Sequence, residues 1–326
     1  TDWYIDQMKR PYYESPALPI SWEYKDYMPG KNEYVRVDTR NTTPLEVKRA
    51  FQFLHSEDKR TKLDGDNYIP SNQLYIKSPD GEKVMFKKAS HFTRSELMVM
   101  EMLSTNQWKR PMYFAVTIGN DYHLGLDPYL ELTGMAYRIT PERSEDGRPR
   151  VNTAEMYENM MHQFRFGNVN QPGIYLDENT LRMCRTHRMM FAQLAEALYM
   201  EGWQTEDTLV RKEKHAKALQ VLDYADEMLP ACNVSYDHTS VSMAALYYEL
   251  DQPEKANTIM QAMADNAIEY IQWGASLDSQ RRSSAQSTIN NYIAIFDYVM
   301  RNFMRFEQKE LFNQYFDIYK SLGLNE

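Results

Sequence analysis

Apolar and polar residues alternate in two different ways along the chain. Residues 33–37, 73–77 and 83–87 alternate at every second position, which is typical of strands with one buried face. The sequence Pro79-Asp80-Gly81 predicts a tight turn that joins the last two strands as a hairpin. From residue 177 onward, apolar residues recur at the three- and four-residue spacing of helices. The pattern therefore predicts an α/β region followed by an all-α region.

The pattern of residues 93–140 predicts the helix and strands at the centre of the α/β region. Thr93-Arg94-Ser95-Glu96 is a capping box, in which the Thr hydroxyl and the Glu carboxylate bind free amides at a helix start. Residues 112–118 are apolar on both faces, which predicts a central strand covered by helices. Residues 135–140 predict another strand. The connection is long enough for a crossover, so the pattern allows a parallel pairing of these two strands.

Three shorter helices are also expected in this half of the chain. Thr43-Pro44-Leu45-Glu46 reads as a second capping box with Pro at the first helical position. Asp127-Pro128 predicts a short helix that Gly134 ends. Residues 153–162 form the third predicted helix.

The helical region resembles an array of tetratricopeptide repeats. Six helices are predicted, and they pair as three hairpins: 178–200, 207–229, 238–250, 253–272, 284–304 and 307–321. Small and aromatic residues fall at the repeat's spacing: Ala218, Leu222, Ala225 and Pro230 in one repeat, and Ala244, Tyr247 and Ala256 in the next. Small residues allow paired helices to approach closely. The pattern predicts three segments: an α/β domain at 1–145, a connecting segment at 146–176, and a tetratricopeptide-like domain at 177–326.

Composition and charge exclude several classes of protein. With 43% hydrophobic and 25% charged residues, the chain is an ordinary globular protein. Its formal net charge of -9 argues against a nucleic-acid partner, which would require clustered Lys and Arg. No apolar run is long enough to span a bilayer. The two cysteines, Cys184 and Cys232, allow one bridge or two separate buried thiols. Because no metal-binding motif is found either, we expect no metal and no cofactor.

Asn120, Asp121 and His123 are the candidate functional residues of the α/β region. They follow the predicted buried strand, at the end of an open α/β sheet where ligands bind. A carboxylate beside an imidazole could act in acid–base chemistry or hold a metal. In the alternative interpretation, Asn120 and Asp121 make a turn and His123 lies on the surface. Similarly, Trp108 could present its ring to a partner or pack beneath the preceding helix.

Five runs of residues resemble a known family, in the same order. They are Thr1-Asp2-Trp3-Tyr4-Ile5-Asp6-Gln7-Met8, Thr105-Asn106-Gln107-Trp108-Lys109-Arg110-Pro111-Met112-Tyr113-Phe114, Tyr129-Leu130-Glu131-Leu132-Thr133-Gly134, Phe166-Gly167-Asn168 and Tyr175-Leu176-Asp177-Glu178. The chain is similar to bacterial multi-pass membrane proteins whose N-terminal domain is of the DUF2723 group. The run around Trp108 is the most specific of the five.

This resemblance implies that the chain is the C-terminal part of a larger protein, and its start at Thr1 fits that expectation. The missing membrane portion would resemble protein O-mannosyltransferases and would be the chain's main partner. We then expect the chain at the periplasmic face of the inner membrane. No catalytic residue of the family can be transferred to this chain. At most, Asp2, Trp3 and residues 120–123 would form the rim of a site.

The expected function is that of an accessory or binding domain, not catalytic by itself, that holds a glycan or a protein. Two alternatives remain open: a soluble hydrolase that uses Asp121 and His123, and a scaffold that docks other proteins of the cell envelope. A pocket that groups Asp2, Asp121 and His123 would favour chemistry. A concave helical groove lined by exposed Tyr would favour binding.

Overall fold

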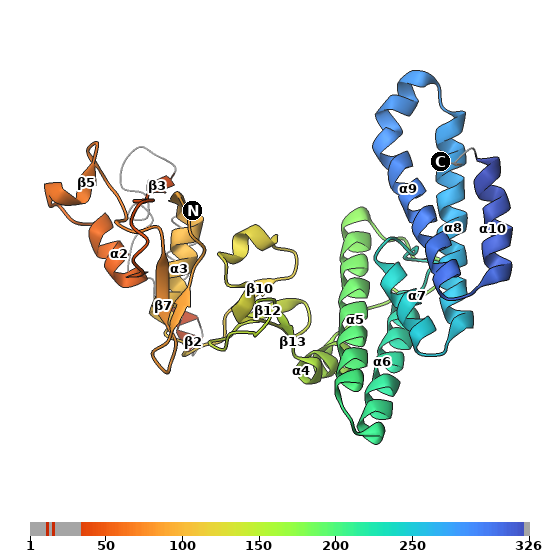
Figure 1. Cartoon of the computed structure of the whole chain (residues 1–326), viewed down its shortest axis with the longest axis horizontal. Helices are drawn as coiled ribbons and strands as arrows, with labels where there is room; N and C mark the ends of the chain where they lie inside the picture. Colours follow the sequence, from red (N-terminus) through yellow and green to blue (C-terminus); the bar gives the residue numbers. More distant parts are fainter. Residues whose placement is uncertain (1–10, 13–14, 17–33, 323–326) are drawn as a thin grey trace. The chain divides into compact units, whose positions relative to one another are not determined.

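The computed structural model describes residues 11–12, 15–16 and 34–322 (Figure 1). The chain divides into two compact units, Thr1–Asn152 and Thr153–Glu326. The first unit contains short strands and helices, and the second contains long helices. The structure thus confirms the predicted fold class, an α/β region with mixed sheets followed by a tetratricopeptide-like helical array.

In its described residues, the first unit has many short strands and two α-helices. The helices are α2 (Val47–Leu54) and α3 (Arg94–Asn106). The first nine strands are β1 (Pro11–Tyr12), β2 (Ser15–Pro16), β3 (Tyr34–Arg36), β4 (Leu45–Glu46), β5 (Lys62–Leu63), β6 (Asp66–Asn67), β7 (Leu74–Lys77), β8 (Lys83–Met85) and β9 (His91–Thr93). The remaining strands are β10 (Tyr113–Ala115), β11 (Leu130–Leu132), β12 (Ala136–Ile139) and β13 (Arg150–Val151). Apolar side chains of α2, α3 and β7 share one buried core with residues of the neighbouring strands.

The capping box at the start of α3 is confirmed. The Thr93 hydroxyl accepts a hydrogen bond from the Glu96 amide at 3.4 Å, and Glu96 Oε2 accepts one from the Thr93 amide at 2.8 Å. The predicted hairpin is also present, because β7 pairs with β8 in antiparallel register, with Ile76 opposite Val84. Both features depend on residues that are close in sequence.

The second predicted capping box, at residues 43–46, is wrong. Leu45–Glu46 is strand β4, which pairs in parallel with β7, and α2 begins only at Val47 without a side-chain cap. The Leu45 amide donates to the Gln73 carbonyl at 2.9 Å. Pairing with β7 therefore satisfies backbone groups that a helix start would have left free.

The prediction of a central strand at residues 112–118 is also wrong. Among the described strands, β10 stands at one end of the four-stranded sheet β10-β12-β11-β13, and its Tyr113 is 47% exposed. It pairs with β12 in antiparallel register, with Tyr113 opposite Arg138, so the parallel arrangement is not found. Only Phe114 of this strand is buried. The segment is apolar on both sides because Met112 and Ile118, which flank the strand, pack partly against the core.

The helix expected at Asp127-Pro128 is a single 3₁₀ turn, Asp127–Tyr129.

The second unit begins with α4 (Thr153–Glu158) and a π-helical turn (Asn159–Gln163). The described part of this unit then contains six long helices, as predicted: α5 (Glu178–Gln204), α6 (Thr208–Met228), α7 (Ser240–Glu249), α8 (Pro253–Ser276), α9 (Ser279–Arg305) and α10 (Lys309–Ser321). Helix α5 packs against α6, α7 against α8, and α9 against α10. Helix α8 also packs extensively against α9, so the hairpins form one continuous array (Figure 1).

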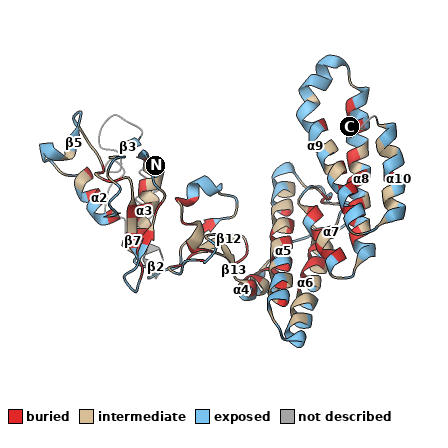
Figure 2. Cartoon of the chain, in the orientation of Figure 1, coloured by how far each residue is buried: buried red, intermediate tan, exposed pale blue. Residues whose placement is uncertain are grey.

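Small residues are buried where the helices pack. Ala218, Ala225, Ala244 and Ala256 are all fully buried, and Tyr247 is nearly so. Gly274 of α8 lies so close to Ile289 of α9 that a Cβ atom at this glycine would be only 2.6 Å from that side chain. Buried residues concentrate on the facing sides of the helices, whereas the far end of the α8–α9 hairpin is largely exposed (Figure 2).

Arg188 of α5 binds the backbone of the segment between α6 and α7. Its guanidinium is fully buried and donates hydrogen bonds to the carbonyl oxygens of Leu229 (2.6 Å), Val234 (2.6 Å) and Ser235 (3.0 Å). The same group lies 5.0 Å from the centre of the Tyr236 ring. These contacts hold the backbone of residues 229–236 against α5 and thereby position the residues that follow.

Candidate functional site

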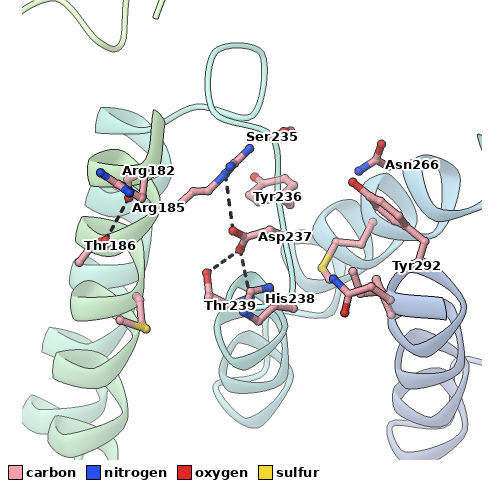
Figure 3. Close-up of a pocket in the computed structure, with 14 residues that line it drawn as sticks. Arg182, Arg185, Thr186, Ser235, Tyr236, Asp237, His238, Thr239, Asn266 and Tyr292 are labelled. Carbon is pink, nitrogen blue, oxygen red and sulfur yellow. Dashed lines mark hydrogen bonds and ion pairs between the residues drawn. The ribbon is translucent and has the colours of Figure 1, made fainter. Parts of the chain in front are cut away.

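A pocket of about 350 Å³ lies in the helical unit (Figure 3). Four segments that are distant in sequence line it: α5, the residues before α7, α8 and α9. The lining residues are Arg182, Arg185, Thr186, Met189, Ser235, Tyr236, Asp237, His238, Thr239, Met263, Asn266, Asn291, Tyr292 and Ile295. We call this the helical pocket. Its volume is within the range of small-molecule sites.

The carboxylate of Asp237 is held firmly in the helical pocket. Its Oδ1 accepts hydrogen bonds from the Thr239 amide at 3.0 Å and from the Thr239 hydroxyl at 2.6 Å. Its Oδ2 lies 3.7 Å from Nε of Arg185, across from α5 (Figure 3). Asp237 is therefore engaged on both oxygens, and it orients Arg185.

The guanidinium of Arg185 has a buried donor without an acceptor. Among the described residues, its Nε has no hydrogen-bond partner, because the distance to Asp237 is that of an ion pair and too long for a hydrogen bond. The side chain is 35% exposed, so a molecule in the pocket can reach it. A neighbouring cation, Arg182, donates to Oδ1 of Asn179 at 3.1 Å and remains exposed.

Tyr292 supplies an aromatic group to the opposite side of the pocket. Its ring stacks on Tyr270 with centroids 3.9 Å apart and nearly parallel planes. Burial and a hydrogen bond with Tyr270 raise the pKa of Tyr292, while hydrogen bonding with Asn266 and the charge of Arg185 act in the opposite direction. Asn266 and Tyr292 thus form a polar cluster that faces Arg185 and Asp237 (Figure 3).

The groups in the helical pocket suit binding more than acid–base catalysis. Its lining has one carboxylate, Asp237, which already accepts two hydrogen bonds and pairs with a cation. General acid–base chemistry needs a group that can exchange a proton with the substrate. Besides the exposed imidazole of His238, the pocket offers guanidinium, amide and hydroxyl groups, together with the apolar side chains of Met189, Met263 and Ile295.

The structure separates the residues predicted from sequence. Asp2 and Trp3 lie outside the described residues. Asn120 and Asp121 are exposed on the 3₁₀ turn Asn120–His123, and the Asp121 carbonyl accepts a hydrogen bond from Lys87 at 3.0 Å. This agrees with the interpretation of Asn120 and Asp121 as a turn.

His123 is neither on the surface nor paired with Asp121. Its side chain is 1% exposed, and Nδ1 lies 2.9 Å from Oδ1 of Asp127. The ring stacks on Phe114 with centroids 5.3 Å apart, and its Nε2 is buried with no partner among the described residues. A general base must come within hydrogen-bond distance of the proton that it removes. The enclosed ring of His123 has no such access in this conformation.

Trp108 follows the interpretation in which it packs beneath the helix. Helix α3 ends at Asn106, and Gln107 and Trp108 both have positive φ angles, 49° and 61°. The turned backbone brings the indole nitrogen to the Lys77 carbonyl, to which it donates at 2.7 Å. Its ring packs against the core of the first unit. Trp108 therefore joins the end of α3 to β7.

Reasoning from sequence did not identify the helical pocket. Arg182 and Arg185 are spaced by three on α5, which places them on one helix face, and Ser235-Tyr236-Asp237-His238-Thr239 is a polar run. Neither pattern is a motif on its own.

The cysteines also differ from expectation: both are free thiols, but only Cys184 is buried and Cys232 is exposed.

Comparison with known proteins adds one relationship for the first part of the chain. Residues 1–87 and 82–158 match the family model described as TMEM260-associated domain 2. The matched residues comprise the first unit and α4, whereas the helical pocket lies beyond them. No curated protein and no solved structure matches the chain.

Two further properties bear on the type of site. No helix among residues 34–322 is both long and apolar enough to cross a membrane. In the same described residues, no group of three or more His, Cys, Asp or Glu side chains is arranged to hold a metal ion.

Proposed function

We propose that this chain is an accessory, ligand-binding region of a membrane glycosyltransferase-like protein, and that catalysis resides in another part of that protein. In this proposal the helical pocket holds the acceptor while the membrane portion transfers the sugar. The observation that carries the proposal is the pocket itself. It gathers cationic and hydrogen-bonding groups from four segments, including the part-exposed side chain of Arg185.

Family relationships support the same proposal for the first unit. The Trp108 run and the four other runs resemble proteins with a DUF2723 domain. The first unit also matches the family model described as TMEM260-associated domain 2, whose description links the domain to another protein. In this proposal the membrane portion lies upstream, at the periplasmic face of the inner membrane, and is the chain's principal partner.

The alternative of a hydrolase that uses Asp121 and His123 has less support. His123 is enclosed and pairs with Asp127, while Asp121 is on the surface. A protein-docking scaffold would also use the helical array, but a pocket of about 350 Å³ suits a small ligand or the end of a chain better than a broad protein surface.

The experiment compares this chain alone with the protein that includes its upstream membrane region. Sugar transfer from a polyprenyl-phosphate sugar to a glycan-bearing acceptor is measured in both. We expect transfer only when the membrane region is present. Arg185→Gln in the longer protein should raise KM for the acceptor and leave kcat nearly unchanged, because it removes binding that is equal in the ground and transition states.

Arg301→Gln is the matched control, since Arg301 is an exposed arginine of α9 that does not line the pocket. It should leave both kinetic constants unchanged. Transfer by the chain alone would overturn the assignment of catalysis to the membrane region. An unchanged KM in the Arg185→Gln protein would overturn the role of the pocket.

A further inference from the structure

The helical pocket carries an excess of positive charge on an acidic protein. Its lining includes two guanidinium groups, Arg182 and Arg185, and one carboxylate, Asp237, which leaves one uncompensated positive charge when His238 is neutral. The whole chain has a formal net charge of -9. A local cationic site in such a chain attracts a negatively charged group more strongly than its surroundings do.

Arg185 is the group best placed to bind that charge. Its Nε is a buried donor without an acceptor, and leaving such a donor unsatisfied costs free energy. Asp237 holds the guanidinium from one side at 3.7 Å, so the remaining donors are directed by a fixed partner. A guanidinium binds carboxylate and phosphate oxygens through paired hydrogen bonds. Because Nε is buried beside Asp237 while the side chain as a whole is 35% exposed, an anionic ligand would bind the terminal nitrogens of Arg185.

The remaining lining suits a ring that carries hydroxyl groups. Asn266 and Asn291 each have both donor and acceptor atoms, as does the hydroxyl of Ser235. The Thr186 hydroxyl donates to the Arg182 carbonyl at 3.0 Å and can still accept. Sugar hydroxyls also donate and accept. An apolar lining residue such as Met263 can contact the C–H face of a sugar ring. An extended peptide would instead require a long groove or a free strand edge.

We propose that the helical pocket binds a sugar unit bearing one anionic group, either a carboxylate or a phosphate, and that Arg185 recognises the anion. This assignment rests on the proposed function and specifies its ligand. Asp237 positions Arg185, and the asparagine amides bind the hydroxyls. The pocket thus selects charged glycans over neutral ones.

Direct binding tests the proposal without any transferase assay. Isothermal titration calorimetry on the purified chain uses three sugars of the same stereochemistry: methyl glucuronide, glucose phosphate and methyl glucoside. We expect the two anionic sugars to bind at least about tenfold more tightly than the neutral one, which is the scale of a charge-assisted hydrogen bond. Their affinity should fall as salt is added. The tighter of the two anionic sugars identifies the anion.

Two variants locate the interaction. Arg185→Gln should abolish the preference for anionic sugars, and Arg301→Gln should preserve it. Asn291→Asp adds a negative charge to an exposed lining position, so it should weaken anionic sugars selectively without disturbing the fold. Unchanged circular dichroism and urea midpoints verify that each variant is folded.

Three results would overturn the proposal. They are equal affinity for the charged and neutral sugars, a preference that persists in Arg185→Gln, and binding of an acidic peptide with no binding of either anionic sugar. In the last case the transfer assay separates the two ideas. A raised KM for the acceptor in Arg185→Gln would retain the pocket as the acceptor site and reject only the proposal that its ligand is an anionic sugar.

Discussion

At the scale of single residues, Arg188 is the most constrained side chain in the helical unit. Burial lowers the pKa of its guanidinium, while Tyr236, Asp237 and Asp226 act in the opposite direction. The three carbonyls that it binds include Leu229 O, at the end of α6, where the helix dipole favours a cation. A buried charge is tolerated here because both terminal nitrogens of the guanidinium donate to backbone oxygens, although Nε has no partner among the described residues.

Arg188→Met should destabilise the helical unit strongly. Methionine fills much of the volume but leaves three carbonyl oxygens without their donor, two of them in buried hydrogen bonds, so we expect a loss of about 3 kcal/mol or more in the free energy of unfolding. Urea denaturation measures it. The matched control is Arg185→Met, one turn earlier on α5, whose guanidinium binds no backbone carbonyl among the hydrogen bonds of the described residues. If both variants lowered the free energy of unfolding by the same small amount, Arg188 would not be the residue that holds residues 229–236 against α5.

At the scale of helices, small residues determine how closely the hairpins pack. Helices α7 and α8 pack against each other, and Ala244, Tyr247 and Ala256 are buried in them. The Tyr247 hydroxyl extends to α6, where it donates to Asp223 at 3.0 Å, and Lys255 of α8 reaches the same carboxylate at 2.6 Å. Three successive helices are therefore tied together at one carboxylate.

Ala256→Leu should cost roughly 1–3 kcal/mol of unfolding free energy, because Ala256 is fully buried and a larger side chain overpacks the interface. Ala262→Leu is the control on the same helix. Ala262 is exposed, and Leu is nearly as good a helix former as Ala, so that change should be almost neutral. Urea midpoints measure both variants. An unchanged midpoint for Ala256→Leu would show that the repeat register is wrong.

At the scale of the whole molecule, buried tyrosines connect the stability of the helical unit to pH. Burial raises the pKa of four tyrosines above the ordinary value of 10: Tyr236, Tyr247, Tyr248 and Tyr315. A neighbouring aspartate contributes at Tyr236, Tyr247 and Tyr315. Their hydroxyls stay protonated in the folded state at pH values where the unfolded chain has lost its protons. The folded state then binds more protons than the unfolded state, so stability falls as pH rises.

We therefore expect the urea midpoint to be insensitive to these groups below about pH 10 and to fall steeply above it. Tyr247→Phe removes one titrating hydroxyl and should make the alkaline fall shallower. Tyr175→Phe, at a tyrosine that is 88% exposed, should leave the fall unchanged. Tyrosinate absorbance in the folded chain gives an independent measure. A midpoint that stayed constant through this alkaline range would contradict the burial of these hydroxyls.

Much of the local structure follows from the sequence alone. The capping box at Thr93, the turn at residues 79–81 and the long helices after residue 177 are all found in the structure. Each is encoded by residues a few positions apart, so spacing is sufficient to predict it. Spacing also predicted the burial of Ala256, because repeat packing depends on one residue type at one helix position.

Only the tertiary structure decided which strands pair and which side chains meet. Leu45 joins β7 instead of starting a helix, and His123 pairs with Asp127 instead of Asp121. The helical pocket brings Arg185 to Asp237 across more than fifty residues of sequence. Such contacts depend on how segments distant in sequence pack and satisfy each other's buried polar groups, and a local pattern of residues does not contain that information.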